Sequence, residues 1–401
     1  MIRKALIGLA GLVALAIAAF FVLAPGVTER SMNRVDGNPL PEISDEALAL
    51  HATLTIVDLH SDSLLWKRSI LDRSDRGHMD LPRLQEGNVA LQVFSSVSKS
   101  PSGQNYDGNS GDSDNITWLA IGQLQPPRTW FSLLERSLYH AEKLDRAAAT
   151  NPEELTTIQS AADIDQLLAT RGGGAALVGG LFSAEGLHNL EGDIANLQTL
   201  YNAGMRMAGL THFFDNEVAG SMHGIERGGL TDLGREAVRQ MEEMGIIIDI
   251  AHCSEMCVAE ILAMAQRPVI SSHGGVQATC DVNRNLSDVQ IRGVAATGGI
   301  IGIGYWEGAV CDTSPAGIAA AMAHIRDLVG IEHVALGSDF DGSVTVPFDT
   351  AGLVHVTQAL IDAGFSDQEI RAVMGGNAMR VIREGLIPMA ELPPAAEEEA
   401  S

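Results

Sequence analysis

The sequence predicts an α/β fold of the (β/α)₈, TIM-like barrel type, in which a single catalytic domain follows an N-terminal membrane segment. Eight short apolar runs follow one another along the 401 residues, and the stretches between them have helical periodicity. Strands that alternate with helices in this way favour a buried parallel sheet. Seven of the runs end on, or within two residues of, a side chain that could bind a metal ion or a substrate. A parallel barrel gathers such ends at one mouth. An open doubly wound sheet would need a Gly-rich phosphate turn after its first strand, and the sequence has none there.

The eight runs are β-like in composition and define the order of the predicted strands. They span residues 54–62, 88–96, 175–186, 205–212, 245–252, 267–273, 298–306 and 333–342. The second ends without an evident ligand, and the others end at His60 and Asp62, Glu185, His212, His252, His273, Tyr305 and Asp339. Residues 231–244 are typical of the helices between them, because Thr231 can cap the first turn and the charges stay off one face.

Length and composition predict the domain boundaries. We expect a leader over residues 1–24, a tether over 25–45, and one decorated barrel over 46–390. Residues 391–401 should form a disordered acidic tail. A polar stretch at 98–115 follows the second strand and would lie at the active-site mouth, either as a lid or as an insertion without a role.

The N-terminal segment predicts a membrane anchor. Arg3 and Lys4 precede twenty uncharged residues, 5–24, which as a helix would span roughly 30 Å of hydrocarbon. This run is longer than a signal-peptide core and has no clear small-x-small site before Pro25, so an uncleaved signal anchor is favoured over a cleaved leader. The basic residues would stay in the cytoplasm, which places the catalytic domain in a periplasm or another extracytoplasmic space.

Charge and cysteine content exclude two classes of site. A formal net charge of −25 with only 26 Lys and Arg residues excludes nucleic acid, whose phosphates need clustered basic side chains. The four cysteines show no CxxC spacing typical of a zinc module. Cys253 follows His252 directly, and we expect it to be a buried spectator thiol.

The residues at the strand ends predict a binuclear metal centre. His60 and Asp62 are one residue apart, so on a continuing strand both project to one side and can hold one ion. His252 and His273 each end an apolar strand, where an imidazole needs a polar partner. Glu185 could bridge two ions, and two ions about 3.5–4 Å apart convert a trapped water into hydroxide and polarise a carbonyl oxygen. The alternatives are a turn with a surface aspartate and two hydrogen-bonded core histidines.

Several motifs together resemble the membrane dipeptidase family, also called renal dipeptidases. The resemblance covers about residues 56–383 and runs in order through HSD, DLPRLQEGNVALQVFS, AEGLH, LTH, IDIAH, PVISSH, NRN, GSDFDG and GGNAMRV. That family consists of binuclear zinc peptidases on an amidohydrolase-type barrel, so the resemblance implies two Zn²⁺ per chain. The chain has EGLH and SDSL where the family often has EGGH and NDLP, which affects substrate preference more than metal binding.

The resemblance also implies a role for each site residue. His60 and Asp62 resemble the ligands of the first zinc, His252 and His273 those of the second, and Glu185 the bridging ligand. His212 resembles the substrate-binding histidine that stabilises the tetrahedral intermediate. Asp339 resembles the substrate-contacting acid that handles the proton of the bridging water. Arg284 resembles the arginine that holds the C-terminal carboxylate of the substrate. The planar fork of arginine suits a carboxylate because it pairs with both oxygens. Asp341 is the other candidate for this proton-handling role, and we prefer Asp339 because it stands at the strand end. His188 and His223 are expected to be structural or solvent-facing.

We therefore expect a zinc-dependent metallo-dipeptidase in which a metal-bridged hydroxide attacks the peptide bond of a dipeptide, with D-residues accepted at the C-terminal position. The expected partners are a small peptide substrate and, through the N-terminal segment, the membrane, and a homodimer is the oligomer to test. One alternative is another amidohydrolase, such as a deacylase or lactonase, which would not need Arg284. The other is a catalytically silent, anchored protein that binds peptides in the same pocket.

Overall fold

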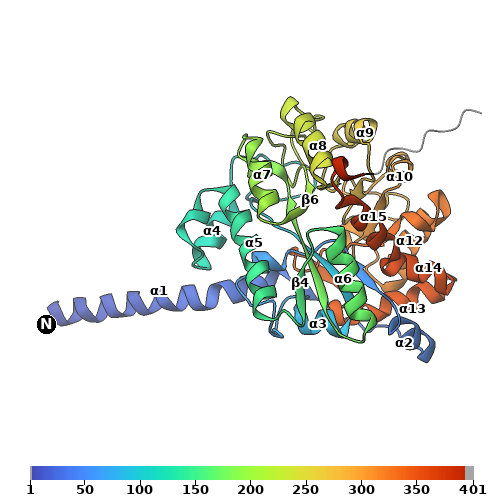
Figure 1. The fold of residues 1–401 in the computed structure, drawn as a ribbon. Coiled ribbons are helices and arrows are strands. Elements are labelled where there is room, and N and C mark those ends of the chain that lie inside the picture. Colours follow the sequence, from blue (N-terminus) through green and yellow to red (C-terminus); the bar gives the residue numbers. More distant parts are fainter. Residues whose placement is uncertain (1, 393–401) are drawn as a thin grey trace, which may run out of the picture.

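Eight parallel strands close into a barrel, which confirms the predicted fold class (Figure 1). The computed structural model describes residues 2–392. Around the barrel the strands run in the order β3-β2-β10-β9-β8-β7-β6-β5, and pairing of β3 with β5 closes the ring. In chain order these strands are β2 (Ile56–Asp58), β3 (Val89–Phe94), β5 (Val178–Glu185), β6 (Met205–Gly209), β7 (Ile247–Asp249), β8 (Ile270–Ser271), β9 (Ile300–Ile303) and β10 (Val334–Leu336). Each lies within one of the eight predicted runs.

Three further strands lie outside the predicted runs. Strand β4 (Leu155–Thr157) pairs with β5, and β1 (Arg34–Val35) pairs with β11 (Thr345–Val346) in a separate two-stranded parallel sheet. The β1–β11 pair joins residues about three hundred positions apart, and it ties the N-terminal part of the chain to the loop after β10.

The barrel strands are buried on both faces, as a parallel sheet covered by helices requires. All six residues of β3 and all eight of β5 are buried. Alternate residues fall in different apolar clusters, with Phe94 and Phe182 in one and Leu91 and Leu181 in another. This alternation follows from the two-residue period of a strand, and burial on both faces explains why the runs are mostly apolar.

The helices between the strands begin and end at capping residues. The helix predicted at 231–244 is α8 (Asp232–Met244), in which the Thr231 side chain accepts a hydrogen bond from Gly234 N, and Gly245 ends the helix in the left-handed conformation. The other helices that follow the N-terminal one are α2 (Asp45–His51), α3 (Leu81–Glu86), α4 (Asn115–Gly122), α5 (Leu133–Thr150), α6 (Ala161–Gly172), α7 (Ala195–Asn202), α9 (Glu255–Met264), α10 (Asp288–Ala296), α11 (Glu307–Val310), α12 (Pro315–Val329), α13 (Val354–Asp362), α14 (Asp367–Arg371) and α15 (Asn377–Gly385).

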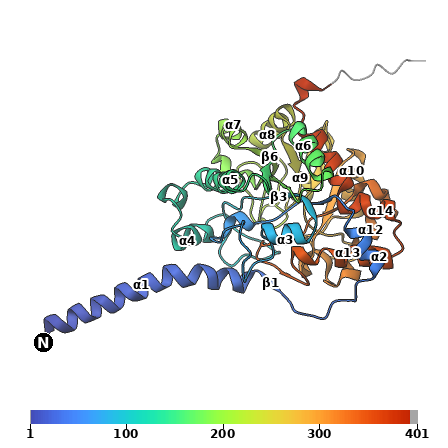
Figure 2. The same ribbon diagram turned by 60° about the horizontal axis from the view of Figure 1, so that its bottom comes forward.

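An N-terminal helix, α1 (Ile2–Met32), extends away from the barrel and meets it with its last turns (Figure 1, Figure 2). Among the residues that the structure describes, no helix is both long and apolar enough to cross a membrane. The prediction of a membrane-anchored protein with an extracytoplasmic catalytic domain is therefore wrong. The uncharged run 5–24 is part of α1, which continues through Pro25 to Met32.

The segment expected to be a tether, 25–45, begins within α1 and continues into β1. Helix α2 then begins at Asp45, next to the expected start of the barrel domain at residue 46. Of the expected acidic tail, 391–401, residues 393–401 lie outside the described part of the chain.

Two glycines on neighbouring strands pack directly against the backbone that precedes His273. A methyl group on Gly302 of β9, or on Gly337 just after β10, would clash with the carbonyl oxygen of Ser272. The strands can approach each other this closely because both residues lack a side chain.

We expect Gly337→Ala to lower the free energy of unfolding by roughly 1–3 kcal/mol, because the Ser272 carbonyl is backbone and cannot rotate aside. The matched control is Gly122→Ala at the end of α4, where no atom lies within 4 Å of the added methyl group and helix propensity favours alanine. Urea unfolding of both variants, followed by circular dichroism, measures the difference. Equal midpoints for the two variants would contradict the close approach.

Candidate active site

The carboxyl ends of the barrel strands bring the predicted site residues to one cavity. The cavity has a volume of about 480 Å³. In chain order the strand ends contribute His60 and Asp62 after β2, Glu185 at the end of β5, His212 after β6, His252 after β7, His273 after β8 and Asp339 after β10. All of them except His60 line the cavity, and all are at least nine-tenths buried.

Glu185 stands at the centre of this group. Its Oε1 atom lies 3.0 Å from His252 Nε2, 3.3 Å from His273 Nε2 and 3.6 Å from His60 Nε2. Its Oε2 atom lies 3.6 Å from His212 Nε2. One carboxylate therefore faces four imidazoles that come from four different strands.

Asp62 and Asp339 extend the group on the side of His60. His60 Nε2 lies 3.6 Å from Asp62 Oδ1 and 3.9 Å from Asp339 Oδ1. Within residues 2–392, three triads have ligand atoms that all lie within 4.8 Å of one another, namely His60, Glu185 and His273, then Glu185, His212 and His252, and finally His60, Asp62 and Asp339. Glu185 and His60 each belong to two triads, so the donor atoms form one continuous cluster.

The donor atoms fit a transition-metal cation. Both ring nitrogens of His60 and the Oδ1 atom of Asp62 are buried without a hydrogen-bond partner among the described residues. Buried polar atoms normally have partners. Imidazole nitrogens and carboxylate oxygens are ligands that Zn²⁺ prefers, and a bound cation would satisfy these atoms.

The electrostatics of the cluster favour positive charge within it. Burial opposes protonation of His60, but the surrounding carboxylates, above all Glu185, raise the pKa of His60 to about 10. Burial raises the pKa of Glu185. Burial also holds the pKa values of His252 and His273 well below their usual range. These two imidazoles are therefore neutral, which is the state in which histidine binds a metal.

A buried aspartate that the sequence analysis missed orients His273. Asp249, at the end of β7, accepts hydrogen bonds from Ala251 N at 2.9 Å, Ser272 N at 2.9 Å and Ser272 Oγ at 2.5 Å. Because the Ser272 hydroxyl donates to Asp249, its oxygen can accept from His273 Nδ1, which lies 2.8 Å away. This tautomer leaves the Nε2 lone pair of His273 directed at Glu185 and His252 in the cluster of donor atoms.

Asp58, at the end of β2, is a second buried aspartate that joins two neighbouring loops through hydrogen bonds. Its carboxylate accepts from His60 N at 3.2 Å, Ser338 N at 2.9 Å, Ser338 Oγ at 2.9 Å and Gln92 Nε2 at 3.0 Å. It thereby joins the start of the His60 loop to the residue before Asp339. The signal for both aspartates is present in the sequence, as an aspartate two or three positions before a histidine in VDLH and IDIAH.

Two of the site residues have left-handed backbone conformations. His252 has φ 64° and Asp339 has φ 59°. Such conformations are uncommon outside glycine and cluster at functional sites, where the surrounding structure imposes them. Here they let the chain turn immediately after a strand and direct the side chain into the cavity.

The structure separates the two aspartates of GSDFDG. Asp339 lines the cavity, whereas Asp341 is fully buried outside the cavity lining. Asp341 pairs with Arg68 and accepts a hydrogen bond from His78 N at 2.6 Å. Burial opposes ionisation, yet Arg68 lowers the pKa of Asp341, so this carboxylate is a charged structural partner.

Arg284 lies in the loop after β8 and lines the same cavity. Its Nη2 atom donates to the His273 carbonyl at 2.9 Å, and its guanidinium carbon lies 5.4 Å from the centre of the Trp306 ring. The guanidinium is therefore held between the β8 and β9 ends of the barrel.

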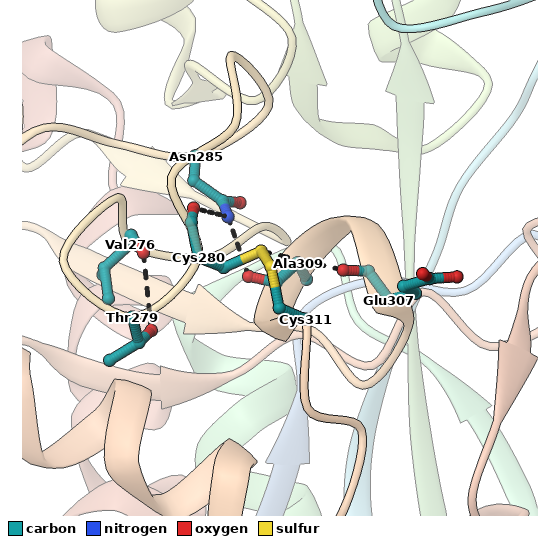
Figure 3. The surroundings of a disulfide bond; sticks show 7 residues. All are labelled: Val276, Thr279, Cys280, Asn285, Glu307, Ala309 and Cys311. Carbon is teal, nitrogen blue, oxygen red and sulfur yellow. Dashed lines mark hydrogen bonds between the residues drawn. A yellow bond between two sulfur atoms is a disulfide. The ribbon is translucent and has the colours of Figure 1, made fainter.

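A disulfide fixes the loop that carries this arginine (Figure 3). It joins Cys280 to Cys311, which follows α11 directly. Beside it, Asn285 Nδ2 donates to the carbonyls of Cys280 at 2.8 Å and Ala309 at 2.9 Å (Figure 3). The other cysteines, including Cys253, are buried and free.

Three residues considered in the sequence analysis lie outside the cavity lining. Tyr305 is fully buried, and its neighbour Trp306 lines the cavity instead. His188 and His223 are also buried, and the His223 ring stacks on Phe213 with 4.5 Å between ring centres. Both histidines therefore have structural surroundings.

The polar stretch 98–115 contributes part of the cavity wall through Ser100, Gln104, Tyr106 and Asn115. The Tyr106 hydroxyl accepts a hydrogen bond from Trp306 Nε1 at 3.0 Å. Asn109 N donates to the His223 carbonyl at 2.8 Å. These contacts hold the loop over the mouth of the barrel.

Comparison with known proteins gives matches over most of the chain. A family described as membrane dipeptidase, peptidase family M19, matches residues 44–387. Dipeptidase aclJ of Aspergillus oryzae is 29% identical over 348 residues, which cover 82% of this chain and 77% of that protein. Dipeptidase 3 of Mus musculus is 26% identical over 366 residues, which cover 86% of this chain and 67% of that protein.

A solved structure shares the fold. The metallo peptidase from Rhodobacter sphaeroides, liganded with a phosphinate mimic of the dipeptide L-Ala-D-Ala, matches with a TM-score of 0.69 and 22% sequence identity. The match covers 82% of this chain and 99% of that one.

We expect Asp249→Asn to weaken metal binding by roughly 10- to 100-fold, because an amide nitrogen cannot accept the Ser272 hydroxyl proton that orients His273. Competition with a chromophoric chelator measures the affinity. The control is Asp165→Asn, which removes a surface partner of Arg383. Equal metal affinities in the two variants, with both folded, would contradict the orienting role.

Proposed function

The chain belongs to the membrane dipeptidase family, peptidase family M19, and is a metallo-dipeptidase, and from this premise we propose that it hydrolyses dipeptides with two zinc ions. The observation that carries the proposal is the position of Glu185, whose two carboxylate oxygens face four imidazoles. A carboxylate with one oxygen directed at each of two neighbouring cations can hold them as a pair.

The proposed ligands divide into two sets around Glu185. His60 and Asp62 would hold one ion, and His252 and His273 the other, with Glu185 shared between them. When bound, such a pair of ions supplies a nucleophilic water of lowered pKa and polarises the scissile carbonyl.

His212 is proposed to stabilise the oxygen of the scissile carbonyl as it gains negative charge. It lines the cavity, and its Nδ1 atom lies 3.2 Å from the Lys99 carbonyl, which can only accept. Its Nε2 atom lies 3.6 Å from Glu185 Oε2, so the imidazole stands beside the proposed metal ligands. A polar group positioned in this way acts most strongly where charge develops in the transition state.

Asp339 is proposed to carry the proton to the leaving amine. Its carboxylate lines the cavity beside His60, whereas the competing Asp341 is engaged by Arg68. A carboxyl group within reach of both the attacking water and the scissile nitrogen can accept a proton in one step and donate it in the next.

Arg284 is proposed to bind the C-terminal carboxylate of the substrate, since a buried guanidinium at the cavity surface pairs with both oxygens of a carboxylate. We also propose that D-residues are accepted at this position, supported by the fold shared with the peptidase solved with an L-Ala-D-Ala mimic. A deacylase or lactonase substrate without a free carboxylate would leave Arg284 without a partner. The homodimer expected from the sequence stays a prediction, which sedimentation of the purified protein tests.

The proposed sharing of Glu185 predicts the metal content. After incubation with zinc and removal of the excess, the purified protein should retain close to two zinc ions per chain. Glu185→Ala should lose at least one ion and lower dipeptide hydrolysis by at least about 100-fold, because both ions lose a ligand. Atomic absorption measures the metal, with Glu384→Ala as a surface control. One tightly held ion in both wild type and Glu185→Ala would refute the binuclear centre.

The proposed role of Arg284 predicts a loss of substrate binding without a loss of metal. A charge-assisted bidentate pair contributes about 1.5–3 kcal/mol, so Arg284→Met should lower kcat/KM for dipeptides by roughly 10- to 200-fold while zinc is retained. Asp339→Asn should instead lower kcat itself.

Dipeptide amides provide the decisive comparison for this variant. In Arg284→Met, free dipeptides and their amides should become nearly equivalent substrates, and Arg292→Met serves as the surface control. If Arg284→Met still prefers the free acid by the wild-type margin, another group binds the carboxylate.

A further inference from the structure

The last turns of α1 form part of the wall of the active-site cavity. Thr28 and Met32 line this cavity together with Asp62 and Glu185. Both α1 residues precede the family match, which begins at residue 44. This part of the wall therefore comes from a segment that lies outside the sequence shared with the family.

A buried ion pair holds this part of α1 in place. Glu29 is only 1% exposed, and its carboxylate accepts from Arg68 Nε at 2.6 Å and from Arg76 Nε at 2.8 Å. Arg68 also pairs with Asp341, two residues after Asp339. Charges buried this deeply must stay paired, because loss of one partner leaves the other uncompensated. The end of α1 is thereby fixed to the loop that follows Asp339.

Two hydrogen bonds continue this attachment beyond the helix. Ser343 N donates to Asn33 Oδ1 at 2.8 Å, and Arg34 N donates to the Val344 carbonyl at 3.1 Å. Since Ser343 and Val344 also line the cavity, the segment after α1 and the cavity wall form one structure.

The wall around Met32 is apolar and lies across the barrel from Arg284. Other apolar residues of the lining are Leu65 and Trp66, which follow β2, Val97, Ile116 and Leu119, which follow β3, and Val344, which follows β10. Arg284 follows β8, which lies three strands from β2 and four strands from β3 in the ring of eight. In a closed barrel of this size these positions face each other across the mouth.

We propose that Met32 is a specificity-determining residue, and that it completes a subsite for a large apolar side chain on the N-terminal residue of the dipeptide. This inference rests on the proposed function, in which Arg284 holds the carboxylate of the C-terminal residue. A dipeptide held at that end directs its N-terminal residue toward the opposite, apolar wall. Methionine suits such a subsite because its unbranched thioether adapts to several apolar shapes.

The test compares substrates that differ in one side chain. Leu-Gly and Gly-Gly share the C-terminal residue, and Gly-Leu places the same side chain at the other position. In the full-length zinc-loaded protein, Met32→Ala should lower the ratio of kcat/KM for Leu-Gly over Gly-Gly by about 3- to 10-fold, while the ratio for Gly-Leu over Gly-Gly stays at its wild-type value. Met32 is 41% exposed, so the substitution leaves the core of the domain intact.

Two further variants sharpen this test. Met32→Glu should raise the ratio of kcat/KM for Lys-Gly over Leu-Gly at least about 10-fold, because the new carboxylate meets the side chain of the N-terminal residue. Val27→Ala, on an exposed position of α1 outside the cavity lining, should leave every ratio at its wild-type value.

The outcomes distinguish this inference from the function on which it rests. Wild-type protein that hydrolyses none of these dipeptides would overturn both. The Met32 subsite alone would be overturned if the wild type hydrolyses these dipeptides but Met32→Ala leaves the ratio for Leu-Gly over Gly-Gly unchanged. A change in the ratio for Gly-Leu over Gly-Gly instead would have the same meaning.

Discussion

Burial of the Glu185 carboxylate is the constraint on which the rest of the site depends. Glu185 is 5% exposed, and a carboxylate removed from water is unstable unless donors or cations surround it. Asp62 and Asp339 add two more acids within the same cluster, while burial keeps His252 and His273 neutral. Without a cation, protonation of His60 is the available compensation, and this explains the direction of its pKa shift. The cluster therefore has the electrostatics of a site built for bound positive charge.

Holding these donors in place requires a second layer of buried acids. Asp58 and Asp249 stand at equivalent positions, at the ends of β2 and β7, and each accepts hydrogen bonds from its own loop and from the start of the next loop around the barrel. Each aspartate thus ties together two neighbouring strand ends whose side chains belong to the metal cluster. The cost of burying them is offset by three or more hydrogen bonds to each carboxylate.

The barrel and the cluster could be predicted from the sequence because both depend on local patterns. Each strand run and the candidate ligand at its end lie within about ten residues. The closed ring brings these ends together independently of the loop sequences. The attachment of α1 could not be predicted, because it depends on Glu29 meeting Arg68 and on Asn33 meeting Ser343, contacts between segments with no common pattern.

The two halves of the cavity are built under different constraints. The polar half consists of strand ends, whose positions are fixed by barrel hydrogen bonding, by Asp58 and Asp249, and by glycine contacts such as those at Ser272. The apolar half consists of loop residues after β2 and β3 together with Thr28 and Met32 of α1, which attach through side-chain ion pairs and a short strand pair. Changes in the first half would disturb the proposed metal ligands, whereas changes at Thr28 or Met32 would alter the shape offered to a substrate side chain. An enzyme arranged in this way can change its selectivity without rebuilding its catalytic centre.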